Sequence, residues 1–315
     1  MYSIECISLA DRKPTELPRS AVVCLGNFDG VHIGHRALFE TAKELRSRLG
    51  NETACAVLCF RAPSTDFLSS RTPSHLSTLE QKLEIFYEAG MDVAFLIDFP
   101  SIRHLSPDAF SAEILCNACR ASAVVCGFNY RFGAGGRGTP EDLKRLPDVE
   151  VAVQDEITVD GETVSSTRIR RLLSEGNATE AARLLSRPYS IRAEVLHGKS
   201  LGQSWGFPTI NQRFPKNMLV PRHGVYVTDC EIDGKHYRGI TNVGTRPTVD
   251  SDAAVNCETY VLDFSEDVYG SLVTVSFLEY LRPEQKFESE DALREQIQKD
   301  VQAARSRPLP REGGI

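Results

Sequence analysis

The chain has 315 residues, 41% of them hydrophobic and 25% charged, which is ordinary for a globular protein of two domains. Its formal net charge is -7 and neither half is basic, which argues against a nucleic-acid partner because such partners need cationic surfaces. No apolar run reaches the roughly 20 residues needed to span a bilayer, and the first residues lack a signal-peptide pattern, so we expect a cytoplasmic protein with no membrane partner.

In chain order, the N-terminal half alternates short apolar runs with amphipathic segments. Such alternation is typical of a parallel sheet with helices on both faces. We therefore expect a Rossmann-like α/β domain that binds its ligands at the carboxyl ends of its strands. The predicted strands cover 21–26, 54–60, 93–99 and 121–128, and the predicted helices cover 32–49, 78–90 and 106–119.

The C-terminal half has a different texture. Residues 166–186 predict two short helices separated by Gly176 and Asn177. Beyond them, short β-rich runs divided by glycine, proline and Asp-Gly turns predict a small antiparallel β-barrel, and 289–306 predicts an amphipathic helix that packs on it. We place the domains at 1–186 and 187–315. The β-rich runs are 189–198, 224–232, 237–244, 256–264 and 272–281.

The number and surroundings of the cysteines indicate free thiols and not disulfides. There are nine, an odd number, and most lie in apolar surroundings, as at Cys24, Cys55, Cys59 and Cys126. This pattern predicts buried free thiols in a reducing compartment, not a disulfide framework.

A glycine-rich turn and two histidines follow the first strand of the α/β domain. His32 and His35 share one face of a helix start, where free N–H groups attract phosphate and Gly34 lets a ligand approach the backbone. Two imidazoles can donate hydrogen bonds to a phosphate, and a protonated one about 4 Å away would contribute on the order of 4 kcal/mol at an effective dielectric constant of about 20. The segment predicts a cradle for ATP phosphates, although two incidental histidines on a helix would give the same letters.

The string GNFDGVHIGH over 26–35 resembles the nucleotidyltransferase superfamily and, within it, the bacterial bifunctional riboflavin kinase/FAD synthetase family. The strings CGFNYRFG over 126–133 and SSTRIR over 165–170 resemble two further motifs of that family. The resemblance implies ATP-dependent adenylylation of FMN to FAD. It assigns catalysis to His32 and His35, ATP binding to Gly26, Asn27, Phe28, Asp29, Gly34, Ser166, Thr167 and Arg168, and the nucleotide or flavin site to Asn129. Taken alone, SSTRIR is typical of a helix start with a surface arginine.

One segment departs from the family. Where the family carries a TFxPHP-like strand end, with an acid or a histidine near the site, residues 59–64 read CFRAPS. Arg61 thus inverts a local charge. This leaves open a riboflavin kinase whose adenylyltransferase domain is degenerate.

The C-terminal half carries a second set of motifs. The string HGKSLGQSWGFPTIN over 197–211 does not match a Walker P-loop and, read alone, is a glycine-rich turn. It resembles the riboflavin kinase signature, and so do 242–248, 257–264 and 280–287. The resemblance implies Mg²⁺ at Thr209 and Asn211, ATP binding by these two with Gly198, Gly202 and Gly206, Glu258 as the base for the ribityl 5′-hydroxyl, and Arg282 near the flavin. Read alone, Glu258 is a solvent-facing residue of an alternating strand.

The resemblance covers the chain from about residue 21 to 305. It implies that the C-terminal domain phosphorylates riboflavin to FMN and that the N-terminal domain adenylylates FMN to FAD, releasing pyrophosphate. Riboflavin, FMN and ATP are then the small-molecule partners, while the oligomeric state stays open. A flavin-sensing barrel joined to a nucleotidyltransferase with another substrate is a further alternative.

Overall fold

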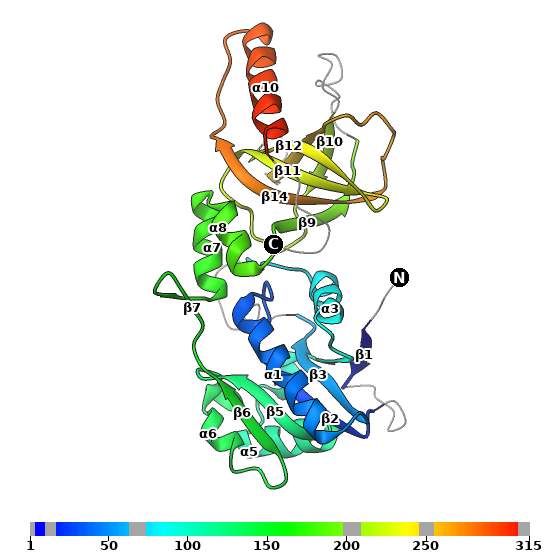
Figure 1. Ribbon diagram of the computed structural model, residues 1–315, viewed down its shortest axis with the longest axis vertical. Coiled ribbons are helices and arrows are strands. Elements are labelled where there is room, and N and C mark those ends of the chain that lie inside the picture. Colours follow the sequence, from blue (N-terminus) through cyan, green and yellow to red (C-terminus); the bar gives the residue numbers. More distant parts are fainter. Residues whose placement is uncertain (1–3, 10–16, 63–73, 198–208, 246–254, 308–315) are drawn as a thin grey trace. The chain divides into compact units, whose positions relative to one another are not determined.

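The structure, a computed structural model, describes residues 4–9, 17–62, 74–197, 209–245 and 255–307. It divides into two compact units (Figure 1). The first unit comprises Met1–Pro73 and Ser77–Ser165, and the second comprises Ser74–Leu76 and Ser166–Ile315.

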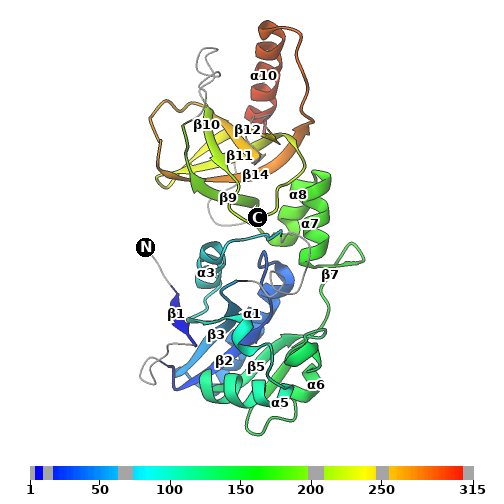
Figure 2. The same ribbon diagram turned by 180° about the vertical axis from the view of Figure 1, so that it is seen from behind.

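The first unit is built on a six-stranded sheet in which every neighbouring pair is parallel. Its strands read as nearly continuous apolar runs because both of its faces are covered. The strand order is β1-β4-β3-β2-β5-β6 (Figure 2). The bounds are β1 Glu5–Ser8, β2 Ser20–Leu25, β3 Thr53–Phe60, β4 Val93–Ile97, β5 Ala121–Gly127 and β6 Glu150–Gln154.

Helices pack on both faces of this sheet, as a Rossmann-like fold requires. Helices α1 (Ile33–Leu49) and α3 (Leu79–Glu88) bury Phe39 and Phe86 on one face. On the other face, the segment Phe110–Ala118 buries Leu115. That segment is a π-helix, η2, where the sequence predicts an ordinary helix. The remaining short elements are α4 Phe99–Ile102, α5 Pro107–Ala109, η3 Ala134–Gly136, α6 Pro140–Leu143 and the hairpin strands β7 Thr158–Val159 and β8 Glu162–Thr163.

The strand order creates a switch point between β2 and β5. The chain passes from β2 to β3 and β4 on one side, and then returns to place β5 on the other side of β2. Ligands of open α/β sheets bind at such a point, outside the carboxyl ends of the strands. Leu25 of β2 is in register with Cys126 of β5, so the segments that follow these two residues meet at the same edge.

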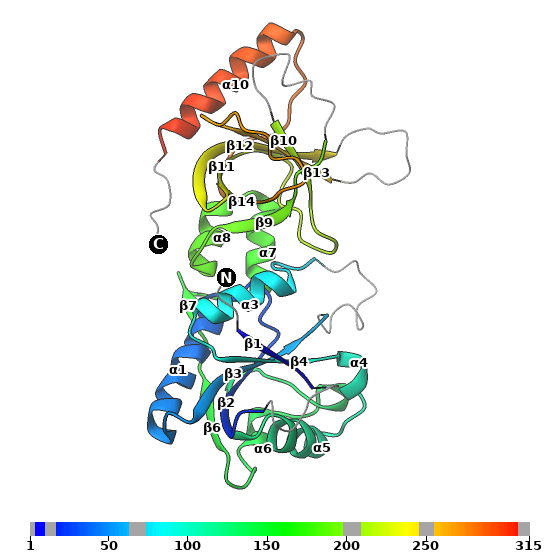
Figure 3. The same ribbon diagram turned by 90° about the vertical axis from the view of Figure 1, so that its right-hand side faces the viewer.

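The second unit contains a six-stranded antiparallel sheet of order β10-β13-β12-β11-β14-β9. The sheet curves until its end strands meet at Leu196 and Asn211, where the Leu196 N–H donates to the Asn211 carbonyl over 2.7 Å (Figure 3). The predicted barrel is confirmed. The bounds are β9 Tyr189–Glu194, β10 Thr209–Arg213, β11 Gly224–Ile232, β12 Lys235–Thr245, β13 Val255–Val261 and β14 Leu272–Arg282.

Among the described residues, three helices accompany the barrel. The predicted C-terminal helix is α10 (Glu290–Arg305), whose Ala304 packs with Val225 and Ile240 of the sheet. Helices α7 (Ser166–Glu175) and α8 (Ala178–Leu185) belong to the same unit, and the Thr179 hydroxyl donates to the Leu278 carbonyl of β14. The structural division therefore falls before α7, while the domain boundary after residue 186 stays a prediction.

Candidate active sites

The turn that follows β2 is held in a strained, buried shape. Phe28 and Val31 have φ values of 49° and 42°, in a region that side chains other than glycine rarely adopt. The Phe28 ring is fully buried and lies 5.5 Å from the rings of both Phe39 and Phe86. A Cβ atom on Gly26 would lie 3.1 Å from the Phe28 ring. Packing of the aromatic core thus fixes the turn, and strain held in this way is common at ligand sites.

The structure brings the two predicted histidines together. His32 is the N-cap of α1 and His35 lies in its first turn, with ring centroids 3.7 Å apart and ring planes 15° apart. The N-cap side chain makes no capping hydrogen bond, so the start of α1 keeps donors for an anion. The predicted Asn27 and the buried Asp29 lie in the preceding turn.

His35 is uncharged at neutral pH. Burial, and then the nearby His32 and Lys82, hold the pKa of His35 well below its ordinary value. A protonated imidazole is therefore disfavoured at this position, and the attraction of such an imidazole to a phosphate stays a prediction. A neutral imidazole can still donate one hydrogen bond, and the buried Nδ1 atom of His35 has no hydrogen-bond partner among the described residues.

Asn129 lies at the same sheet edge, beyond the end of β5. It is exposed, and the Tyr130 N–H closes a turn over it by donating to the Gly127 carbonyl over 3.0 Å. Further along, Phe132 and Gly138 exchange two backbone hydrogen bonds, of 3.2 and 2.8 Å. Taken alone, this glycine-rich segment reads as a flexible loop, whereas the structure gives it a fixed path.

The remaining predicted triphosphate residues lie in the second unit. Ser166, Thr167 and Arg168 form the first turn of α7. The Arg168 side chain is 10% exposed, and its Nη2 atom lies 4.0 Å from Oε1 of Glu180 on α8. Glu180 of α8 therefore helps to fix the orientation of the Arg168 side chain on α7.

Arg61, the departure from the family pattern, follows β3 directly. Its backbone N–H donates to the Ile97 carbonyl over 3.1 Å, which extends the pairing of β3 with β4. Its Nε atom lies 3.9 Å from Oδ1 of Asp98, and both side chains are about half exposed. The inverted charge therefore faces a carboxylate.

In the barrel, three polar side chains form a row across adjacent strands. Glu258 of β13 is directly opposite Asn211 of β10 on one side and Asn242 of β12 on the other. Thr209, two residues before Asn211, projects from the same face of β10. Hydroxyl, amide and carboxylate oxygens are the ligands that Mg²⁺ prefers, so these residues fit the predicted ion. Gly198, Gly202 and Gly206 lie outside the described residues.

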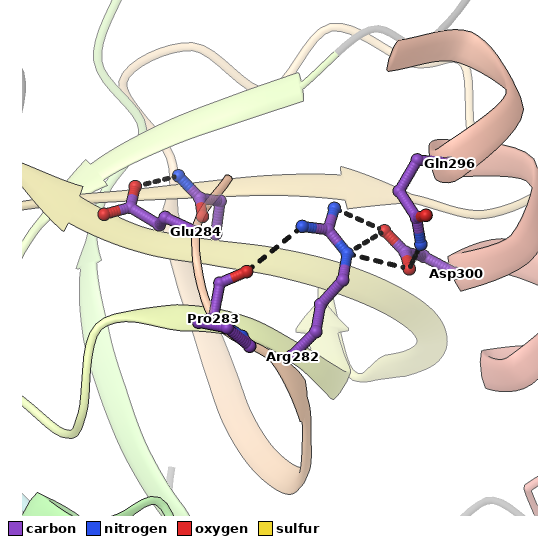
Figure 4. A network of polar contacts seen from close by, with 6 residues as sticks. Arg282, Pro283, Glu284, Gln296 and Asp300 are labelled. Atoms are coloured by element: carbon purple, nitrogen blue, oxygen red, sulfur yellow. Dashed lines mark hydrogen bonds and ion pairs between the residues drawn. The ribbon is translucent and has the colours of Figure 1, made fainter. Parts of the chain in front are cut away.

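Arg282, the predicted flavin-proximal residue, is held by α10 (Figure 4). Its Nε atom donates to both Asp300 oxygens over 3.1 Å, and its Nη2 atom donates to Oδ2 over 2.7 Å. The Gln296 amide donates to the same carboxylate over 2.9 Å. Asp300 and Gln296 could not be singled out from the sequence, where they read only as polar positions of an amphipathic helix.

Glu284 extends this network toward the strand row. The Asn242 amide donates to Oε1 of Glu284 over 3.1 Å, and a Cβ atom on Gly244 would clash with the same carboxylate. Asn242 and Glu284 lie within strings that resemble the kinase family. That resemblance is the one feature of the sequence that points to these two residues.

Two further expectations from the sequence concern the state of the cysteines and the presence of membrane-spanning helices. All nine cysteines are free and most are buried, as predicted. In the part of the chain that the structure describes, no helix is long and apolar enough to cross a bilayer.

A parallel α/β unit with a histidine pair at its switch point, joined to a barrel with a Thr-Asn-Glu face, defines a two-domain transferase of nucleotide-derived groups. The FAD synthetase family model matches residues 15–168 and the riboflavin kinase model matches 185–307. The chain belongs to the bifunctional riboflavin kinase/FMN adenylyltransferase family.

Individual relatives support this membership. The chain is 36% identical to the bifunctional riboflavin kinase/FMN adenylyltransferase of Listeria monocytogenes, covering 90% of this chain and 91% of that protein. It is 35% identical to the Pseudomonas fluorescens enzyme of the same name, covering 93% and 94%. A crystal structure from Streptococcus pneumoniae, named as a macrolide-efflux protein, is 32% identical, with a TM-score of 0.88 over 97% of this chain and 100% of that one.

Proposed function

We propose that this chain makes FAD in two ATP-dependent steps. The barrel transfers the γ-phosphate of ATP to riboflavin and yields FMN, and the α/β unit transfers AMP from ATP to FMN, yielding FAD and pyrophosphate. The observation that carries the proposal is the presence in one chain of both the His32–His35 pair at the switch point and the Asn211–Glu258 pair on the barrel.

For adenylyl transfer, the protein needs to align its substrates and offset charge on the phosphorus oxygens, with little covalent chemistry of its own. We assign ATP-phosphate binding to the start of α1 and the turn before it. His32 and His35 donate hydrogen bonds to the transferring group, His35 as a neutral imidazole. Asn129 contacts the nucleotide or the flavin. The residues assigned to ATP are Gly26, Asn27, Phe28, Asp29, Gly34, Ser166, Thr167 and Arg168.

For phosphorylation, Glu258 accepts the proton of the ribityl 5′-hydroxyl as that oxygen attacks the γ-phosphorus. Thr209 and Asn211 would hold Mg²⁺ together with ATP, and the ion, when bound, offsets the charge of the phosphate oxygens. Asp300 fixes Arg282 in one orientation, from which the guanidinium positions the flavin. We assign cover of the ATP phosphates to Gly198, Gly202 and Gly206.

The proposal extends to the setting of the enzyme. Riboflavin, FMN and ATP are its small-molecule substrates, and we place it in the cytoplasm, where ATP is available. We keep the domain boundary after residue 186, near the start of the riboflavin kinase match at residue 185.

The test separates the two activities by product. Purified protein is incubated with ATP and Mg²⁺ and with either riboflavin or FMN, and the flavins are resolved by chromatography. We expect His32→Ala to lose FAD formation and keep FMN formation, and Glu258→Gln to lose FMN formation while still converting supplied FMN to FAD. A folded variant in which either single change abolishes both activities would show that the two-site assignment is wrong.

The same incubations decide between the alternatives. FMN without FAD from the unaltered protein would indicate a kinase with a degenerate adenylyltransferase unit. Trace FMN formation that Glu258→Gln leaves unchanged would favour a flavin-sensing barrel.

A further inference from the structure

Lys82 on α3 is an unusual buried cation. Lys82 is only 2% exposed, and no carboxylate pairs with its ammonium group among the residues that the structure describes. A buried charge without a partner of opposite sign costs several kcal/mol, so such groups are uncommon unless they serve a ligand or a neighbour. None of the motifs in the sequence analysis contains this lysine.

The start of α3 is tied to the turn before the histidine pair. The Gly30 N–H donates to the Ser77 hydroxyl over 3.1 Å, and Ser77 immediately precedes the N-cap Thr78. Thr78 and Gln81 form a reciprocal capping box, with hydrogen bonds of 3.0 and 3.2 Å, that fixes the first turn of α3. The Lys82 N–H donates to the Thr78 carbonyl over 3.1 Å. The backbone of Lys82 is therefore rigidly placed beside the site.

The Lys82 side chain lies between the end of β3 and the first turn of α1. Its charge acts on both the Cys59 thiol and the His35 ring, so the ammonium group lies near both. Burial raises the pKa of the Cys59 thiol even though Lys82 opposes that shift, so the thiol stays neutral and does not offset the ammonium charge. The positive charge therefore remains available to the site.

The groups around His35 come from four segments. On its own helix, His32 stacks on it; from α3, Lys82 acts on it; from the turn, the apolar Phe28 ring lies 5.1 Å away. Strand β3 contributes the Cys59 thiol, which lies near Lys82. The turn also contains Asp29, which is buried. Lys82 is thus a cation, contributed by α3, next to the histidine pair. His35 of that pair is uncharged.

We infer that Lys82 is a positioning residue of the adenylyl-transfer site: its buried ammonium, fixed on α3 beside the turn and the first turn of α1, supplies the positive potential that favours a polyphosphate at the histidine pair. The inference rests on the proposed function, because it assumes that the pair binds ATP phosphates. It assigns to one lysine the fixed charge that the sequence analysis expected from a protonated histidine. A neutral site built from imidazoles alone would attract anions less.

The experiment compares three variants of the full-length protein. Lys82→Met removes the charge and keeps the length of the side chain, and Lys82→Arg keeps a cation. Lys43→Met is the matched control, because Lys43 lies on α1, is partly exposed and pairs with Glu40 over 2.7 Å. The readouts are the pH profile of FAD formation from FMN and ATP, and the titration of His35 followed by NMR of labelled histidine. FMN formation from riboflavin and the thermal midpoint check that each variant is folded.

We expect Lys82→Met to lower kcat/KM for FAD formation by at least about tenfold, the scale of losing one electrostatic contact to a transition state. It should also raise the midpoint at which His35 titrates, because a repelling cation is gone. Lys82→Arg should restore most of both properties, and Lys43→Met should change neither.

Two results would overturn the inference. One is a folded Lys82→Met protein with the His35 titration of the unaltered protein, and the other is such a protein with an unchanged rate of FAD formation. His35→Ala, run in parallel, separates this failure from that of the proposed function. If His35→Ala abolishes FAD formation while Lys82→Met does not, only the role of Lys82 is wrong; if His35→Ala keeps FAD formation, the proposed site is wrong.

Discussion

The imidazoles of His32 and His35 lie stacked, with centroids 3.7 Å apart, and the Cα atom of Gly34 faces the edge of the His32 ring. A Cβ atom at Gly34 would lie 3.2 Å from both Cε1 and Nδ1 of that ring, closer than side chains normally approach. The glycine therefore sets how closely the His32 ring can approach the first turn of α1.

This contact predicts the effect of Gly34→Ala. Alanine in a helix is normally favoured over glycine by about 1 kcal/mol, so we expect little loss of stability. The His32 ring should shift by a few tenths of an ångström, and FAD formation should fall by about tenfold because transfer depends on alignment. Flavin chromatography measures the rate, and calorimetry measures the thermal midpoint.

Ser47→Ala, on an exposed position of the same helix, is the control and should change neither quantity. A Gly34→Ala protein with the rate of the unaltered chain would mean that the position of the His32 ring does not limit adenylyl transfer.

His35 predicts a loss of stability in acid. Its pKa in the folded unit lies well below the ordinary value of 6.5, so the unfolded chain takes up a proton as the pH falls through about 6.5 while folded His35 does not. Acid therefore favours unfolding between that value and the lowered pKa, by up to about 1.4 kcal/mol per pH unit. The stability contributed by a neutral His35 is complete above pH 7 and declines as the pH falls.

The measurement is the thermal midpoint of the first unit at pH 7.5 and at pH 5.5, for the unaltered protein and for His35→Gln. Glutamine does not titrate, so the variant should lose less stability between the two conditions. His104→Gln removes an exposed histidine of the same unit and should leave the difference unchanged. Equal acid sensitivity of His35→Gln and the unaltered protein would contradict the prediction.

The sequence predicts the α/β unit well because its strands are buried on both faces and its helices are amphipathic. The edge strands of the sheet are harder to predict because their local sequence patterns are weak. Strand β1 (Glu5–Ser8) has only four residues, and β6 (Glu150–Gln154) mixes charged and apolar ones at the sheet edge. The π-helix η2 was predicted as an ordinary helix, because its apolar spacing alone does not distinguish the two.

Long-range contacts account for what the sequence could not predict about the sites. The His32–His35 pair follows from spacing within one helix, but the neutrality of His35 depends on burial and on Lys82 of another helix. In the barrel, the family resemblance supplied Glu258 and Arg282, whereas Asp300 reaches Arg282 only after α10 has packed. A residue whose role depends on such a contact has no local signature.

The Arg282–Asp300 pair predicts a coupled change in stability and flavin affinity. The two side chains are 18% and 6% exposed, so replacing the carboxylate with an amide in Asp300→Asn leaves a largely buried guanidinium without its counter-charge. We expect the barrel unit to lose about 1–3 kcal/mol. We also expect the KM for riboflavin to rise more than kcat falls, because we assign Arg282 to the flavin and not to the reacting phosphate.

Asp263→Asn is the matched control for this variant. It removes a carboxylate that pairs with Arg305 of the same helix over 2.7 Å, but both partners are exposed, at 71% and 55%. It should leave the thermal midpoint and the riboflavin KM unchanged. An Asp300→Asn protein that is destabilised but keeps its KM would show that the pair only anchors α10.

Arg61 decides whether the departure from the family pattern weakens FAD formation. Its guanidinium lies 3.9 Å from the Asp98 carboxylate, and both groups are about half exposed. Exposed pairs of this kind contribute at most about 1 kcal/mol, so Arg61→Ala should change kcat/KM for FAD formation by less than about fivefold. Arg103→Ala, another exposed arginine of this unit, controls for the loss of one positive charge. A much larger gain in FAD formation, seen in Arg61→Ala alone, would mean that the arginine suppresses adenylyl transfer and that the chain acts mainly as a kinase.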